Sequence, residues 1–179
     1  MSVTGVQTCA LPIYFFPVRV ETPRHDAGLG LWLRGDGRGN FAPVSASESG
    51  VRVFGEQRGA ALADYDGDGR IDLLVGQNAG PAKLFHNLTA QPGLRVRVSG
   101  PPGNPDGVGA VLRLKFGERL GPAREIHAGS GYWSQDSAVP VMGGAGRPTQ
   151  IVVRWPAGTS TTNELSGGAR EISVPAPKP

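Results

Sequence analysis

One nine-residue stretch of the chain alternates acidic residues with small or polar ones. It runs from Asp64 to Asp72 and has the sequence DYDGDGRID. Four carboxylates this close together repel one another unless a cation lies among them. Calcium takes six to eight hard oxygen ligands at about 2.3–2.6 Å, and a loop can supply them from alternate positions. The stretch therefore predicts a calcium-binding loop.

The alternation also predicts which groups bind the ion. The expected ligands are the side chains of Asp64, Asp66, Asp68 and Asp72 and the peptide carbonyl of Arg70. Asp72 would close the site directly or through a water, and Gly69, in sixth place, permits the sharp turn. An ordinary turn rich in Asp and Gly is the alternative, but turns rarely need four acids. We expect Ca²⁺ as the only cofactor.

Strands rather than helices are expected on both sides of this loop. Val75 occupies the twelfth position, where an EF-hand would need Glu. The flanking runs 60–63 and 73–75 are short and apolar, which is typical of strands. The loop is therefore predicted to join two neighbouring strands.

The sequence from Ala61 to Val75 resembles the calcium-binding FG-GAP or VCBS repeat of integrin-like β-propellers, in which such a loop joins two strands of a blade. Upstream, residues 33–41 read LRGDGRGNF and are similar to the hairpin of the same repeats. The tripeptide Arg34-Gly35-Asp36 spells an integrin-recognition sequence, but it coincides with this hairpin turn, whose geometry already explains Gly and Asp. We therefore do not expect adhesion through it.

Three later blocks resemble the ASPIC/UnbV domain. They are GNPDGVGA at 103–110, GSGYWSQ at 129–135 and VRWPAG at 153–158. That domain typically follows FG-GAP repeats in secreted, cartilage-acidic-protein-like chains. The resemblance implies a calcium-binding, non-enzymatic fragment of an extracellular or cell-surface protein, with a role in interaction or adhesion and an unknown protein or glycan partner.

The first residues have a different character. The stretch from Val3 to Ile13 resembles a translated sequencing adapter, so we expect residues 1–13 to be an artefact that contributes nothing to the fold. The sole cysteine, Cys9, lies in it, and no disulfide is predicted. The natural N-terminus would then be missing, and the lack of a visible signal peptide says nothing against secretion.

The composition favours an all-β protein. The chain has 28 Gly and 16 Pro among 179 residues, and no run reaches the roughly 18 apolar residues of a membrane span. Strict alternation at 94–98 and 112–116 predicts strands, with Leu112, Leu114 and Phe116 on one buried face. Ile151, Val153 and Trp155 follow the same pattern.

These patterns predict an order of domains. Residues 14–90 form a partial β-propeller blade region, residues 91–174 a small β-sandwich-like or barrel-like ASPIC/UnbV domain, and residues 175–179 a frayed tail. The formal net charge of +3 is small and the arginines are scattered, so nucleic acid is not an expected partner and the charges are placed on solvated strand faces.

Two alternative functions remain open. Tyr132 and Trp133 stand beside Ser134 and Gln135, and exposed aromatic rings in such surroundings could stack on sugars. Burial in the domain core is the simpler explanation, and it fits Trp155 best. A carbohydrate-binding module is therefore one alternative. An accessory region of a secreted hydrolase is the other.

Overall fold

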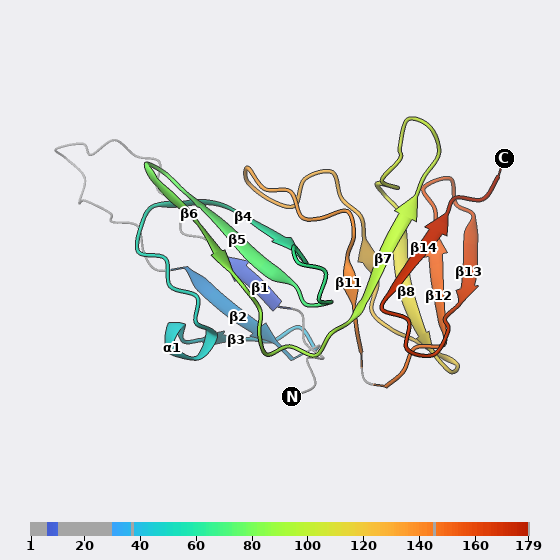
Figure 1. Ribbon diagram of the computed structural model, residues 1–179, viewed down its shortest axis with the longest axis horizontal. Coiled ribbons are helices and arrows are strands. Elements are labelled where there is room, and N and C mark those ends of the chain that lie inside the picture. Colours follow the sequence, from blue (N-terminus) through green and yellow to red (C-terminus); the bar gives the residue numbers. More distant parts are fainter. Residues whose placement is uncertain (1–6, 11–29, 37, 145, 179) are drawn as a thin grey trace.

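The computed structural model describes residues 7–10, 30–36, 38–144 and 146–178, and within them nearly all regular structure is β-strand (Figure 1). The one helix of this part, α1, covers only Ala46–Ser49, with Ser45 accepting from the Glu48 amide as its N-cap. No helix of the described part is long and apolar enough to cross a membrane. The all-β prediction is confirmed.

The first half of the chain carries two three-stranded sheets. One has the order β1-β2-β3, formed by Gln7–Ala10, Leu31–Gly35 and Phe41–Val44. The other has the order β4-β5-β6, formed by Gln57–Ala63, Asp72–Gln77 and Gly80–Phe85. All neighbours are antiparallel. Strands β4 and β5 flank the acidic loop and β2 and β3 form the hairpin, as predicted.

Strand β1 falls inside the segment expected to be an adapter artefact. It pairs with β2 at four positions, from Gln7 opposite Arg34 to Ala10 opposite Leu31. The expectation that residues 1–13 contribute nothing to the fold therefore remains a prediction. The β1–β2 ladder is the contact that argues against it. Residues 1–6 and 11–13 lie outside the described part.

A small core lies under one face of the β4-β5-β6 sheet. Val53, Leu73 and Val75 are buried there, and Trp32 of β2 and Phe85 of β6 pack against them. The opposite face is open, since Leu74 and Leu84 are directly paired and about half exposed. The sheet therefore has apolar side chains on both faces, but only one face is covered.

The second half of the chain is a two-sheet sandwich, which lies beside the first half in Figure 1. One sheet has the order β10-β8-β12-β13 with β9 beside β8, and the other has the order β11-β7-β14. The bounds are β7 Leu94–Ser99, β8 Val111–Phe116, β9 Arg119–Leu120, β10 Arg124–Glu125, β11 Val141–Met142, β12 Gln150–Arg154, β13 Ser160–Glu164 and β14 Glu171–Pro175. The described strands form no closed barrel, so the sandwich alternative is the one observed.

The core of this sandwich is larger than that of the first half. Leu112, Leu114, Ile151, Val153 and Trp155 are at most 3% exposed, and they face Leu94, Val96, Val98 and Val174 of the other sheet. Phe116 is only partly buried against this core. The alternating pattern therefore identified the inward-facing residues of β8 and β12.

The last strand closes the sandwich in an unusual direction. Strand β14 runs parallel to β7, the first strand of the domain, and pairs with it from Glu171 opposite Arg95 to Pro175 opposite Ser99. The Ala176 amide then donates to the Ser99 carbonyl at 2.7 Å. Ordered pairing thus extends two residues beyond the predicted domain boundary at Val174, into the segment expected to be a frayed tail.

Candidate metal site

The acidic loop connects β4 to β5 at one end of their sheet. Ala63, the last residue of β4, is paired with Asp72, the first residue of β5, so the loop begins and ends at adjacent points. Gly67 and Gly69 have φ angles of 79° and 85°, which residues with a Cβ adopt only rarely. At Gly69 an added Cβ would also lie 3.1 Å from the Gly93 carbonyl oxygen. Both glycines therefore set the shape of the loop.

Asp64 organises the first half of the loop. Its side chain is only 2% exposed. Oδ1 accepts a hydrogen bond from the Gly67 amide at 2.9 Å, and Oδ2 accepts one from the Gly69 amide at 2.9 Å. Because a buried carboxylate is stable only when its charge is compensated and its oxygens are hydrogen-bonded, these amides hold the loop wrapped around Asp64.

Asp72 organises the C-terminal end of the loop in the same way. It is 2% exposed, and its Oδ2 accepts from the Tyr65 amide at 3.2 Å. Its Oδ1 accepts from the Asn87 amide at 2.8 Å, and the Asn87 side-chain amide donates to the Ile71 carbonyl at 3.0 Å. The segment that follows β6 is thereby fixed to the base of the loop.

Three of the four predicted carboxylates come together. Carboxylate oxygens of Asp64, Asp66 and Asp72 all lie within 4.8 Å of one another. Asp68 lies in a second, overlapping group, in which its carboxylate, that of Asp66 and an imidazole nitrogen of His86 also meet within 4.8 Å. The loop therefore presents two adjacent sets of donor atoms that share Asp66.

Arg70 holds Asp68 on its side of the loop. The Arg70 guanidinium forms an ion pair with Asp68 Oδ2 and donates from Nε to the Ala90 carbonyl at 2.7 Å. The Arg70 amide donates to Asp68 Oδ1 at 2.8 Å. The expectation for Arg70 concerned its carbonyl oxygen as a ligand, which stays a prediction. The contacts of its side chain were not foreseen.

The pKa of Asp68 reflects these contacts. Burial by itself would raise the pKa of this carboxyl group. The hydrogen bonds from the side chain and the amide of Arg70, together with the positive charges of Arg70 and His86, more than offset that effect and hold the pKa below its ordinary value of 3.8. Asp68 is therefore kept in its charged form, the form that binds a cation.

Sequence reasoning missed two residues of this site. Arg95 on β7 was placed with the charges on solvated strand faces, but its side chain is only 18% exposed, and its Nη1 lies 3.0 Å from Asp64 Oδ2. His86 was not among the predicted ligands, but its Nε2 lies 3.0 Å from Asp66 Oδ2. Arg95 also pairs with Glu171 at 3.0 Å and so links the loop to β14. Neither contact has a local signal in the sequence.

The integrin-like tripeptide serves the hairpin between β2 and β3. Asp36 accepts from the amides of Arg38 and Asn40 at 2.6 and 3.1 Å and from the Asn40 side chain at 2.7 Å. The Asn40 side chain and the Arg38 amide thereby lower the pKa of Asp36. Arg34 is paired with Glu48 of α1 at 2.8 Å. The acid and the base of the tripeptide therefore both have structural partners.

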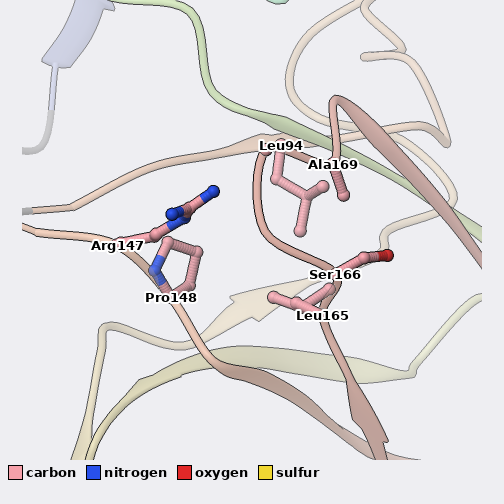
Figure 2. Close-up of a pocket in the computed structure, with 7 residues that line it drawn as sticks. Leu94, Arg147, Pro148, Leu165, Ser166 and Ala169 are labelled. Atoms are coloured by element: carbon pink, nitrogen blue, oxygen red, sulfur yellow. The ribbon is translucent and has the colours of Figure 1, made fainter.

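A small cavity of about 110 Å³ lies in the sandwich (Figure 2). The side chains of Leu94, Pro148 and Leu165 face into it, Arg147 lies at its edge, and the Ser166 hydroxyl points away. A ligand pocket of the usual kind is several times larger and has converging polar groups. This cavity is an imperfection of packing where strand ends meet.

Comparison with known proteins identifies the second half of the chain. Residues 100–178 match the family described as ASPIC and UnbV. The predicted resemblance to the ASPIC/UnbV domain is therefore confirmed over these residues. The resemblance of the first half to FG-GAP or VCBS repeats remains a prediction.

Two curated relatives resemble part of the chain. Cartilage acidic protein 1 of Xenopus tropicalis is 30% identical over 73 residues, which are 41% of this chain and 11% of that protein. Cartilage acidic protein 1 of Mus musculus is 29% identical over 94 residues, which are 51% of this chain and 15% of that protein. The chain thus matches less than a sixth of the length of these longer proteins.

Proposed function

We propose that the acidic loop binds Ca²⁺ and that the ion has a structural role in an extracellular protein of the interaction or adhesion type. The observation that carries this proposal is the clustering of carboxylate oxygens from Asp64, Asp66 and Asp72 within 4.8 Å of one another. Hard carboxylate oxygens on a loop of this kind are the donors that Ca²⁺ prefers. Asp68 and the Arg70 carbonyl would complete the set.

The charges around the loop support a divalent ion. Four carboxylates lie between Asp64 and Asp72, and the guanidinium groups of Arg70 and Arg95 each pair with one of them. With His86 neutral, the loop has a formal charge of minus two. A divalent cation would neutralise this charge.

Binding fits this loop better than catalysis. Asp64 and Asp72 are nearly buried, and their oxygens accept from four backbone amides that define the loop. A carboxylate that transfers protons must change its charge, which would weaken those bonds. We therefore propose that the protein is not an enzyme and that the ion stabilises the junction between blade and sandwich.

The proposed location rests on the relatives. An ASPIC and UnbV domain and the similarity to cartilage acidic protein 1 favour an extracellular or cell-surface protein. Antibodies raised against the sandwich should then detect the natural protein in the medium or on the cell surface. Antigen confined to the cytoplasm would contradict this part of the proposal.

Titration calorimetry and thermal unfolding in Ca²⁺ test the metal. Saturation at about 100 times the Kd should stabilise the protein by about 2.7 kcal/mol, which raises the Tm of a chain of this size by about 5–10 °C. Asp66→Ala and Asp68→Ala should each remove the shift. Asp106→Ala is the matched control, because it removes an equally acidic, exposed side chain outside the loop. Absence of both heat and stabilisation in millimolar Ca²⁺ would contradict the proposal.

A further inference from the structure

Two aromatic side chains of the sandwich are presented to solvent as a stacked pair. Tyr132 is 44% exposed and Trp133 is 77% exposed, whereas Trp155 is almost fully buried. The two exposed rings lie with centroids 5.2 Å apart and planes 11° from parallel. Core burial is therefore excluded for this pair. Large aromatic side chains that stay exposed to water together are candidates for a binding site.

The backbone holds this pair in a conformation that it would not adopt alone. Trp133 has a φ angle of 48°, in the left-handed region that bulky residues avoid. The Ser134 hydroxyl donates to the Tyr132 carbonyl at 2.9 Å, and the Ser130 amide donates to the Ser134 carbonyl at 3.0 Å. Strain of this kind persists only where the surroundings fix it, and it is concentrated at functional sites.

The loop that carries the pair is fixed to the edge of β4. The Ala60 amide donates to Ser134 Oγ at 3.0 Å, and the Leu62 amide donates to Asp136 Oδ1 at 2.9 Å. At Gly59 an added Cβ would lie only 2.6 Å from the Trp133 carbonyl oxygen, so only a residue without a side chain fits at this position of β4. The position of Trp133 is therefore set by both halves of the molecule.

Trp133 lines a groove of about 330 Å³ between the two halves. Gly59, Ala61, Leu74 and Gly76 of β4 and β5 give it an apolar floor. Gln77 and Asn78 line the groove as well, and their side-chain nitrogens donate to the Pro81 carbonyl and to Glu56. Two amide side chains are therefore held in fixed positions at the rim of the groove.

We propose that this groove binds a neutral carbohydrate, with one sugar ring stacked on Trp133. A pyranose has an apolar face of C–H groups and a rim of hydroxyl groups, which matches an aromatic ring beside a lining of polar, uncharged side chains. Arg58, the cation of the groove, has its guanidinium 3.7 Å from Glu56, so the local charge is close to balanced. Balanced charge favours a neutral ligand over an acidic one.

A single-stranded nucleic acid is the competing ligand, since bases also stack on aromatic side chains. It requires cations along its phosphates. The groove offers Arg58, which already has an acidic neighbour. A second β-sheet is the other competing occupant, because Leu74 belongs to the open apolar face of the β4-β5-β6 sheet. The balanced charge of the groove therefore favours the sugar over the nucleic acid, and the second sheet is separated from it by the test below.

The test is titration of the intact chain with four neutral hexasaccharides, namely cellohexaose, chitohexaose, laminarihexaose and mannohexaose. Binding is followed by calorimetry and by tryptophan fluorescence. At least one sugar should bind with a Kd below about 1 mM and shift the emission of the exposed Trp133. A thymidine hexanucleotide is titrated in parallel. Failure of all four sugars, or preference for the oligonucleotide, would overturn the proposal.

Trp133→Gly is the decisive variant, because glycine accepts a positive φ without strain and the fold should be kept or stabilised. It should weaken sugar binding by at least about tenfold. Phe54→Ala is the matched control, since Phe54 is 79% exposed and does not line the groove, and it should bind normally. Equal binding by wild type and Trp133→Gly would overturn the site.

Sedimentation velocity separates the second-sheet alternative. If the groove were instead covered by another copy of the chain, a dimer would form with rising concentration and Leu74→Ser would dissociate it. That result, with no sugar binding, would assign the groove to assembly and overturn the proposal. The sugar site is independent of the calcium proposal, because Trp133→Gly leaves every carboxylate of the acidic loop in place.

Discussion

The two halves of the molecule bury the apolar side chains of their strands in different ways. The sandwich encloses twelve buried apolar residues between two of its own sheets. The β4-β5-β6 sheet buries three, with partly buried neighbours, under one face and leaves Leu74 and Leu84 open on the other. The sandwich therefore covers the apolar faces of its own strands, whereas the β4-β5-β6 sheet has one apolar face that the described residues leave largely uncovered.

The contrast extends to polar groups. The edge of β4 is covered by polar groups of the sandwich, namely Ser134, Asp136 and the Ser137 amide, which donates to the Leu62 carbonyl at 2.9 Å. The acidic loop is similarly bridged to the sandwich through Arg95. Backbone groups of β4 and a carboxylate of the acidic loop therefore depend on the sandwich for hydrogen-bond and ion-pair partners. Mutations can measure how much these contacts contribute to stability.

The largest effect is expected in the sandwich core. Leu112 is fully buried, and Leu112→Ala should lower the free energy of unfolding by about 2–5 kcal/mol. Leu74→Ala, on the open face, should cost less than about 1 kcal/mol, because little surface returns to water. Urea unfolding of both variants measures the difference. Equal losses would mean that the open face is covered in solution.

A smaller effect should separate two acids of the loop. Asp64→Asn removes a nearly buried charge that pairs with Arg95, so it should cost about 1–3 kcal/mol even without calcium. Asp66→Asn, at a more exposed position, should leave stability in EDTA almost unchanged and weaken only the calcium response. Unfolding curves with EDTA and with Ca²⁺ test both. An Asp66→Asn variant that is as unstable in EDTA as Asp64→Asn would show that the two acids share one structural role.

A mutation at the contact between β4 and the sandwich loop 134–137, here called the seam, should disturb the structure only locally. Asp136→Ala removes the acceptor of the Leu62 amide and should cost about 1 kcal/mol. Hydrogen exchange at Leu62 should become faster, while exchange at Val153 in the sandwich core should not change. Asp106→Ala, far along the chain from this seam, serves as the control. Faster exchange throughout the sandwich would mean that the two halves unfold as one unit.

Acid should gradually weaken the first half of the chain, which contains Asp36 and Asp68. The pKa values of Asp36 and Asp68 are lower in the folded protein than their ordinary value of 3.8. Their stabilising effect is therefore complete above that value and is lost as the pH falls below about 4. Asp36→Asn should flatten this part of the stability profile. A profile that is identical in wild type and variant between about pH 4 and pH 2 would contradict it.

The smallest effect is expected for removal of residues 1–13. If they are an adapter artefact, stability and calcium affinity should change by less than about 1 kcal/mol, the size of an ordinary point mutation. A larger loss would show that β1 is part of the fold and that its ladder with β2 stabilises the hairpin.

Local patterns in the sequence predicted most strands but few contacts between them. The alternation of Leu112 with Leu114 and of Ile151 with Val153 is visible within five residues, so their inward orientation could be predicted. The acidic loop is equally local. The parallel pairing of β7 with β14 joins segments more than seventy residues apart, and no local pattern specifies such a partner.

The same limit applies to the candidate sites. Three of the predicted carboxylates do cluster, because alternate positions of one turn are brought together by the turn itself. Arg95 and His86 reach the loop only through the fold. Ser134 was interpreted as a polar neighbour of an aromatic pair. Its hydrogen bond with the edge of β4, like that of Asp136, depends on the docking of two separate sheets.

The parallel pairing of β7 and β14 has a mechanical consequence. The chain enters β7 at Leu94 and leaves β14 at the opposite end of the same ladder, beside Ser99. A pull applied between β6 and Pro175 would therefore act along the ladder and load its hydrogen bonds together in shear, instead of opening them one at a time. The β7–β14 ladder should accordingly resist such a pull more strongly than a hairpin that opens from its end.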